Sequence, residues 1–292
     1  MGEHSDNAYE ALTEDNDPRW AFGTGFADPL AGVDTSVPAG VAGEDLAAYC
    51  LMLGDDALVM SHRLQQWCTN APTLEDEVAL ANIALDLLGQ ARLLLTRAGA
   101  AEDRGRTEDH FAYFRDASEF RNVTLVEIEN GDFADCVVRL LAFATWRLAL
   151  LDRLGSSVDP VLAAIAAKSV KELTYHRDYA AQWAIRLGDG TDDSRARMER
   201  AIGAVWPLVA ELFALSDAER RLADAGVAVD PASLGDEFEA VIATVLGAAS
   251  LAATSVPVAS ATAGRDGEHT PALDALLAEL QVLARADPEA TW

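Results

Sequence analysis

Carboxylate and imidazole side chains recur at helical spacing in two apolar segments of this 292-residue chain. Lys168, Glu172 and His176 follow one another at steps of four, and an earlier segment places Asp86 and Gln90 four residues apart. Residues at this spacing share one face of an α-helix, so we expect these groups to point into a helical core. Carboxylates and histidines on inward-facing helix positions are the ligands of carboxylate-bridged di-iron centres.

The pattern falls short of such a centre. A di-iron bundle takes a carboxylate from each of two helices and a Glu-x-x-His pair from each of the other two. Neither Asp86 nor Glu172 has a histidine three residues later, and the helix predicted after Asp132 lacks a carboxylate at the height of Glu172. Lys168 brings a positive charge to the same face, so we interpret the site as one in which a salt bridge replaces the metal. The residues of this predicted polar core are Asp55, Asp86, Gln90, Lys168, Glu172 and His176.

Helical periodicity and capping signals predict the elements that position these residues. Thr73 followed by acidic residues, Asp132, and Asp159 followed by Pro160 mark helix starts. The fifth helix is expected to bend at Pro207. The predicted helices cover 44–68, 73–98, 132–154, 159–188, 191–214, 234–252 and 271–286.

The arrangement of these helices predicts an all-α, ferritin-like four-helix bundle with additional C-terminal helices. Two long helix pairs are joined by one long polar crossover, 99–131, which contains a short helix around 110–114. We expect 44–292 to form one helical domain. Turn-forming residues predict an extended or disordered arm over 1–43, whose Trp20, Phe22 and Phe26 are suited to dock on a neighbour.

Composition excludes several classes of function. The net charge is −26, from 22 Lys+Arg and 48 Asp+Glu, so nucleic acid is not an expected partner. Three widely spaced cysteines without a CxxC pair predict buried thiols rather than disulfides or a zinc site. The chain has no long uncharged apolar run and no basic, then apolar, N-terminus, which predicts a cytoplasmic protein without membrane contact.

Three segments carry a resemblance to a known family. They are LANIALDLLGQAR at 80–92, NGDFAD at 130–135 and KSVKELTYH at 168–176. These segments resemble the subunit designated C in the phenylacetyl-CoA epoxidases, also called ring 1,2-phenylacetyl-CoA monooxygenases, and the likeness extends from about residue 45 to residue 292. The first 44 residues fall outside it.

The resemblance implies a structural subunit of a multicomponent oxygenase of aerobic phenylacetate degradation. In that family a catalytic subunit, designated A, holds the di-iron centre and performs the epoxidation. A small subunit, designated B, helps assembly, and a reductase subunit with FAD and an iron–sulfur cluster supplies electrons from NADPH. No cofactor is expected in this chain. Phenylacetyl-CoA is expected near the contact between this chain and the catalytic subunit, and the resemblance suggests that the residues closest to it are Glu119, Phe120, Arg121, Asn122, Arg220, Arg221 and Leu222.

Two other functions remain open from the sequence. The first is a metal-binding carboxylate protein with its own oxidase activity, which requires a ligand that the third long helix does not provide. The second is a stand-alone helical module that binds an acyl-CoA, which the strongly negative charge disfavours. The buried polar residues also admit a purely structural interpretation, in which their hydrogen bonds fix the register of the helices. Whether the chain is itself an enzyme is therefore left open.

Overall fold

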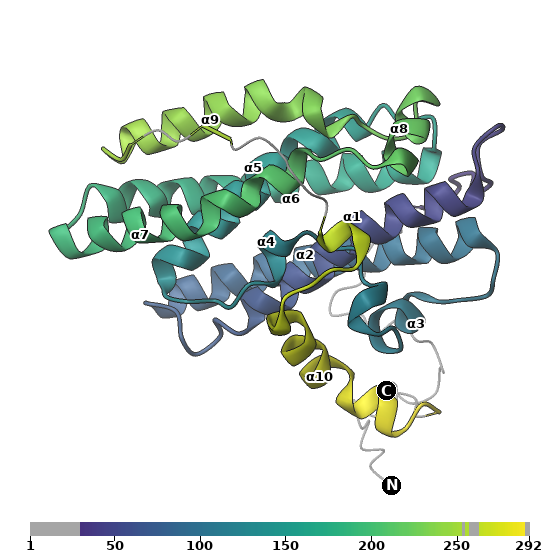
Figure 1. Cartoon of the computed structure of the whole chain (residues 1–292), viewed down its shortest axis with the longest axis horizontal. Helices are drawn as coiled ribbons and strands as arrows, with labels where there is room; N and C mark the ends of the chain where they lie inside the picture. Colours follow the sequence, from purple (N-terminus) through teal and green to yellow (C-terminus); the bar gives the residue numbers. More distant parts are fainter. Residues whose placement is uncertain (1–29, 253–254, 257–262, 290–292) are drawn as a thin grey trace, which may run out of the picture.

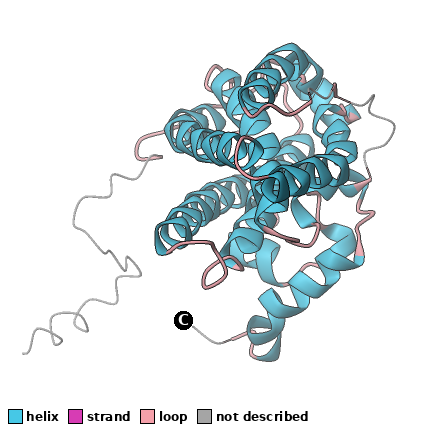
Figure 2. Cartoon of the chain, turned by 90° about the vertical axis from the view of Figure 1, so that its left-hand side faces the viewer, coloured by secondary structure: helices cyan, strands magenta, loops and turns pink. Residues whose placement is uncertain are grey.

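The computed structural model describes residues 30–252, 255–256 and 263–289, so Trp20, Phe22 and Phe26 of the expected arm lie outside the described residues. This part of the chain is helical and contains no strand, which confirms the all-α class (Figure 1, Figure 2). Its α-helices are α1 (Gly43–Gln65), α2 (Leu74–Glu102), α3 (Glu108–Tyr113), α4 (Thr124–Glu127), α5 (Phe133–Leu154), α6 (Pro160–Gly188), α7 (Asp192–Val209), α8 (Asp217–Asp224), α9 (Gly235–Ala248) and α10 (Pro271–Ala286).

Local sequence sets the starts of three of the four long helices. The side chains of Thr73, Asp132 and Asp159 accept hydrogen bonds from backbone N–H groups in the first turns of α2, α5 and α6. Such a cap contributes about 1 kcal/mol because it satisfies a donor that has no partner within the helix. Pro160 then occupies the first turn of α6, where its missing N–H costs nothing. These predicted starts are confirmed.

A buried ion pair joins the two helical hairpins. Arg97 of α2 pairs with Asp159, the residue that caps α6, and both side chains are almost fully buried, at 1% and 0% exposure. The same guanidinium donates to the backbone carbonyls of Thr35 and Ser36, which holds the segment before α1 against α2. Because a buried charge is costly without its partner, these contacts fix the α1–α2 hairpin against the α5–α6 hairpin.

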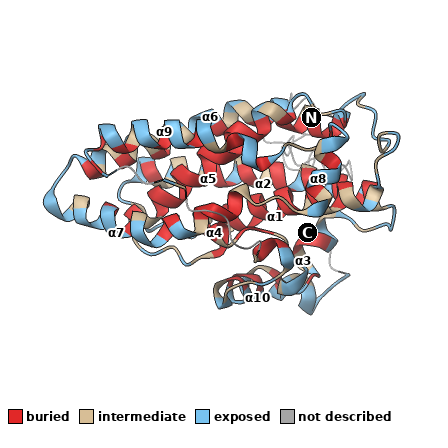
Figure 3. Cartoon of the chain, turned by 45° about the horizontal axis from the view of Figure 1, so that its top comes forward, coloured by how far each residue is buried: buried red, intermediate tan, exposed pale blue. Residues whose placement is uncertain are grey.

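The helices α1 and α5 lie inside the molecule, and other helices surround them. Helices α7 and α9 pack against α5, α8 packs against α1, and the crossover carries α3 and α4, with α10 lying against α3 (Figure 1). Most positions of α1 and α5 are therefore buried on every side, whereas α2 and α6 each keep an exposed side (Figure 3).

The crossover and the C-terminal half differ from the sequence prediction in detail. The crossover, predicted as a polar connection, packs on the bundle through apolar side chains, because Phe111, Phe120 and Val126 are each fully buried. The helix α8 follows α7 after a bend of 51°, and the sequence analysis missed it. Helix α7 runs through Pro207 and tightens into a 3₁₀ turn at Ala210–Phe213.

One cysteine also differs from the prediction. Cys50 and Cys136 are buried thiols, as expected. Cys68 follows the end of α1 and is exposed, so the expectation that all three are buried is wrong.

Helix α2 is unusually apolar. By length and composition alone it could cross a membrane. Among the other described helices, the same is true only of α7 and α8 if the two are taken as one bent span. In this structure 44% of its most apolar 18-residue window is buried inside the protein, where it packs along α1.

Candidate functional site

A buried arginine occupies the space among α1, α2 and α5. The Nε of Arg147 donates to Gln90 Oε1 at 3.0 Å, and its Nη1 donates to the carbonyl oxygen of Leu53 at 3.2 Å. Arg147 and Gln90 are both 0% exposed, and Arg147 Nη2 has no hydrogen-bond partner among the described residues. Burial lowers the pKa of Arg147 to about 10, so its charge persists at neutral pH. The sequence analysis found no carboxylate on this helix at the height of Glu172 and missed its arginine.

Gln90 connects Arg147 to helix α6 through hydrogen bonds. Its Nε2 donates to Glu172 Oε2 at 3.0 Å, and the Nζ of Lys168 donates to Glu172 Oε1 at 2.9 Å. The exposure of the side chains rises along this chain of contacts, from 19% for Glu172 to 38% for Lys168. The structure thus brings Gln90, Lys168 and Glu172 together as predicted. It corrects the assignment of Lys168 as the charge that replaces the metal, because Arg147 holds the buried position and Lys168 lies at its edge.

A second pair spans α2 and α6. His176 Nε2 lies 3.0 Å from Asp86 Oδ2, with the histidine 1% exposed and the aspartate 37% exposed. The Nδ1 atom of His176 is buried and has no hydrogen-bond partner among the described residues. Spacing predicted that each residue lies on the inward face of its own helix, Asp86 with Gln90 and His176 with Glu172, and the structure adds the direct contact between the two helices.

Asp55 does not belong to this polar cluster. Its carboxylate forms a bidentate ion pair with Arg115 of the crossover, at 2.9 and 2.5 Å, and accepts the backbone N–H of Arg121 at 2.9 Å. The neighbouring Asp56 pairs in the same way with Arg265, at 3.0 and 2.8 Å. Grouping Asp55 with Asp86 is therefore corrected: guanidinium groups from distant segments hold both α1 carboxylates and anchor those segments to α1.

This donor set does not fit a di-iron centre. Such a centre needs carboxylates from four helices and two histidines at one height. Here Asp55 and Asp56 are already paired with arginines, and the buried side chains that meet between α5 and α2 are an arginine and a glutamine, Arg147 and Gln90, rather than carboxylates. Among the described residues, no group of three or more His, Cys, Asp or Glu side chains is arranged to hold a metal ion. A cation at the core would also face the charge of Arg147 directly.

The crossover segment 119–122 turns two of its four side chains inward. Phe120 and Asn122 are fully buried, and Asn122 donates to a Glu127 carboxylate oxygen at 2.9 Å. Glu119 ends the 3₁₀ turn Ala117–Glu119, and its carboxylate accepts the backbone N–H of Asp116, while the guanidinium of Arg121 donates to the carbonyls of Ser118 and Phe120. The contacts of this segment are internal ones that hold the crossover on α1.

The second suggested substrate segment, 220–222, is the middle of α8. Leu222 is buried at 2% exposure, and Arg221 forms a bidentate ion pair with Asp45 at the start of α1, at 2.7 and 2.6 Å. Arg220 is exposed and lies 3.9 Å from Asp217. The two segments therefore meet α1 at different levels, with 119–122 beside Asp55 and 220–222 beside Asp45.

A titratable pair that the sequence analysis did not find lies between the crossover and α10. His269 Nδ1 is 2.6 Å from Glu127 Oε2 and its Nε2 is 3.1 Å from the carbonyl oxygen of Phe120, so both ring nitrogens face acceptors. Burial disfavours the charged imidazolium, but these bonds and the Glu127 charge outweigh it and raise the pKa of His269 above 6.5. Burial likewise opposes ionisation of Glu127, and hydrogen bonds from His269, Thr270 and Asn122 outweigh it and lower the pKa of Glu127 below 4.5.

The signs of these shifts define a window of pH. The raised pKa of His269 contributes stability that is complete below 6.5 and is lost as pH rises through the folded-state pKa. The lowered pKa of Glu127 contributes stability that is complete above 4.5 and is lost as pH falls through its folded-state pKa. The pair therefore stabilises the fold most between pH 4.5 and 6.5.

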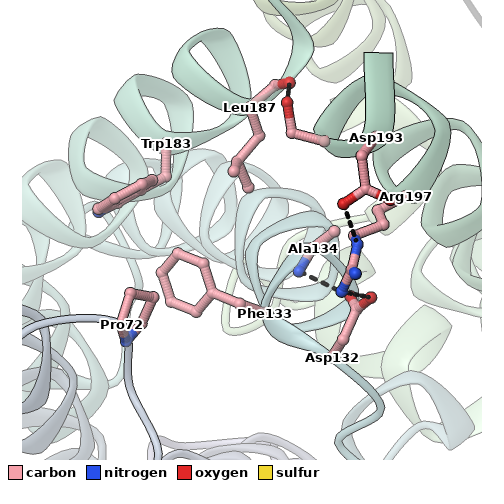
Figure 4. Close-up of a pocket in the computed structure, with 9 residues that line it drawn as sticks. Pro72, Asp132, Phe133, Ala134, Trp183, Leu187, Asp193 and Arg197 are labelled. Atoms are coloured by element: carbon pink, nitrogen blue, oxygen red, sulfur yellow. Dashed lines mark hydrogen bonds and ion pairs between the residues drawn. The ribbon is translucent and has the colours of Figure 1, made fainter. Parts of the chain in front are cut away.

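A small recess lies at one end of the bundle, between α5, α6 and α7 (Figure 4). Its volume is about 240 Å³, and Phe133 and Trp183 form an edge-to-face aromatic wall with ring centroids 5.0 Å apart. On the polar side, Arg197 lies between Asp193 at 2.9 Å and Asp132 at 3.5 Å. These two carboxylates neutralise the guanidinium, so the recess offers no free positive charge to an anionic ligand.

The fold and its core define an all-helical protein in which arginine ion pairs and a glutamine occupy the centre of a long-helix bundle. A family model described as phenylacetic acid catabolic protein matches residues 33–292. The subunit designated C of the 1,2-phenylacetyl-CoA epoxidase of Escherichia coli (strain K12) is 45% identical over 249 residues, which cover 85% of this chain and 99% of that protein. The chain belongs to the phenylacetic acid catabolic protein family, and the resemblance to this epoxidase subunit is confirmed.

Proposed function

We propose that this chain is the non-catalytic structural subunit of a 1,2-phenylacetyl-CoA epoxidase complex in phenylacetate degradation. In this proposal its bundle is of the ferritin-like type, and it supports the catalytic subunit that carries the di-iron centre. The observation that carries the proposal is Arg147, a buried cation hydrogen-bonded to Gln90 where a metal-binding bundle would present carboxylates.

The charges in the core support a structural role for this chain and a catalytic role for its partner. A ferrous cluster requires several carboxylates to balance its charge, and a fixed guanidinium at the same position repels it. The two carboxylates of α1, Asp55 and Asp56, are neutralised by Arg115 and Arg265. The chain therefore retains a rigid helical frame without the donors that oxygen activation needs.

The rest of the complex follows from the relationship to the epoxidase. The proposed partners are the catalytic di-iron subunit, the small assembly subunit, and a reductase subunit that uses NADPH, FAD and an iron–sulfur cluster. Phenylacetyl-CoA would bind near the contact between this chain and the catalytic subunit, and the complex would act in the cytoplasm. The internal pairing of Arg121 and Arg221 favours a substrate site built largely by the catalytic subunit.

The test is reconstitution with the catalytic subunit, the small assembly subunit and the reductase, followed by epoxidation of phenylacetyl-CoA. Asp86→Asn and Glu172→Gln in this chain should leave kcat within about twofold, because neither carboxylate ligates a catalytic metal in this proposal. Carboxylate-to-amide changes at the metal ligands of the catalytic subunit provide the matched comparison and should abolish turnover. Epoxidation by this chain without its catalytic partner, or a loss of about 100-fold in kcat for Asp86→Asn in an intact complex, would overturn the proposal.

A further inference from the structure

Within the described part of the chain, one side of the bundle has no other element packed on it, and this side is unusually apolar. Along α2 the side chains of Leu74, Val78 and Leu85 are 71%, 53% and 60% exposed, and on α6 Tyr175 is 50% exposed. The three α2 residues are four and seven residues apart, which places them on one stripe of the helix. Less than half of the most apolar window of α2, 44%, is buried inside the protein. A contiguous apolar strip of this kind marks an interaction surface.

The polar core opens onto the same side. The contacts His176–Asp86 and Gln90–Glu172 bridge α2 and α6, and their outer members, Asp86 and Glu172, are 37% and 19% exposed. Leu85 directly precedes Asp86, and Tyr175 directly precedes His176, so these exposed apolar residues lie at the same level of α2 and α6 as the polar core. We call this surface of α2 and α6 the α2–α6 face.

Positive charge is also placed unevenly. The chain carries 48 acidic and 22 basic residues, and its two lysines, Lys168 and Lys171, both lie on the exposed side of α6, one and two turns before Tyr175. Lys168 is paired with Glu172, whereas Lys171 has no ion-pair partner among the described residues. The α2–α6 face therefore combines an apolar strip with an ammonium group that is free to pair with a carboxylate.

We propose that the α2–α6 face is the surface on which the catalytic partner docks. The partner presents a helical face with an apolar stripe that covers Leu85 and Tyr175, and a carboxylate that pairs with Lys171. This inference rests on the proposed function and identifies the surface through which the chain supports its partner.

A second copy of this chain fits the face less well. Each copy carries a charge of −26, so two copies repel one another. A two-fold contact through the centre of the face would also bring the same lysines of both copies towards each other, and the two carboxylates at its centre, Asp86 and Glu172, already pair with His176 and Lys168 of their own copy. A partner of different sequence avoids both costs.

Binding of the purified full-length chain to the purified catalytic subunit tests the inference. Leu85→Glu and Lys171→Glu should each raise the Kd about tenfold or more, because they place a charge in the apolar strip or reverse the free ammonium. Val282→Glu is the matched control, since Val282 is a 57% exposed apolar residue on α10, away from the face. Its Kd should stay within about twofold of wild type, and equal melting temperatures should show that all variants are folded.

The outcomes separate this inference from the proposed function. If wild type binds the catalytic subunit, and Leu85→Glu and Lys171→Glu bind it equally well, the docking surface is elsewhere and the inference is overturned, while the proposed function stands. If Leu85→Glu abolishes self-association of the wild type but leaves binding to the catalytic subunit unchanged, the face belongs to a second copy and the inference is again overturned. If the wild type does not bind the catalytic subunit, the proposed function fails and this inference fails with it.

Discussion

Replacing Arg147 with methionine perturbs the buried core most directly. Arg147→Met keeps a long, flexible side chain but removes the N–H group that donates to Gln90 Oε1. Gln90 is 0% exposed, so water cannot replace this donor. An unsatisfied buried acceptor costs about 1–3 kcal/mol. The carbonyl of Leu53 loses less, because it also lies inside helix α1. We therefore expect Arg147→Met to lower the free energy of unfolding by about 2 kcal/mol.

The double variant Arg147→Met with Gln90→Leu sharpens this prediction. Removing both polar partners eliminates the orphaned oxygen, and Glu172 retains its bond to Lys168 and access to solvent. Replacing both members of a buried hydrogen-bonded pair is close to neutral. We expect the second substitution to restore at least about 1 kcal/mol of the loss, a coupling that a double-mutant cycle measures.

Urea unfolding of the purified chain provides the assay, with the slope m unchanged so that midpoints compare directly. Arg153→Met is the control, because Arg153 is on the same helix but 37% exposed, and its ion pair with Glu237 is at the surface. The control should lose no more than about 0.5 kcal/mol. A loss below about 0.5 kcal/mol for Arg147→Met, or strictly additive losses in the double variant, would refute the role assigned to this arginine.

Three further predictions concern the other charged pairs. Lys168→Met should cost less than about 1 kcal/mol in urea unfolding, because the lysine is 38% exposed, and a loss of several kcal/mol would contradict its place at the edge of the core. Arg115→Met should cost about 3–5 kcal/mol in the same assay, because it leaves Asp55 buried without its counter-ion, and a loss like that of Lys168→Met would show the pair to be solvated. His269→Gln should lower the melting temperature most between pH 4.5 and 6.5, where the bond to Glu127 joins two charged groups, and an equal loss at pH 9 would exclude this ion pair.

Sequence reasoning recovered most of the long helices because their signals are local. The caps at Thr73, Asp132 and Asp159 depend on neighbouring residues, and the structure begins α2, α5 and α6 directly after them. Helix α8 was missed because its eight residues are strongly polar, so no sustained apolar period reveals it. Its position depends on contacts with α1, including the ion pair between Arg221 and Asp45.

The site was predicted in part for the same reason. Spacing on single helices grouped Asp86 with Gln90 and Glu172 with His176, and the structure brings both pairs together across α2 and α6. Arg147 was missed because a di-iron site requires a carboxylate on that helix, and only acidic residues were considered there. An arginine amid the apolar run of 140–151 is the available signal.

Helical periodicity cannot predict that Arg115 is the ion-pair partner of Asp55. Arg115 belongs to the crossover, far from Asp55 in sequence, and the two meet only when the crossover packs on α1. The same holds for Arg265 and Asp56, which join the C-terminal part of the chain to α1.

Iron content tests the central claim most directly. The purified chain, produced without its partners in iron-supplemented cells, is analysed for metal by inductively coupled plasma mass spectrometry, with its co-purified complex with the catalytic subunit as the comparison. Because arginine and glutamine side chains occupy the core, we expect far less than one iron per isolated chain, and about two irons per complex, all held by the catalytic partner. About two irons per isolated chain would contradict the claim that this bundle holds no di-iron centre.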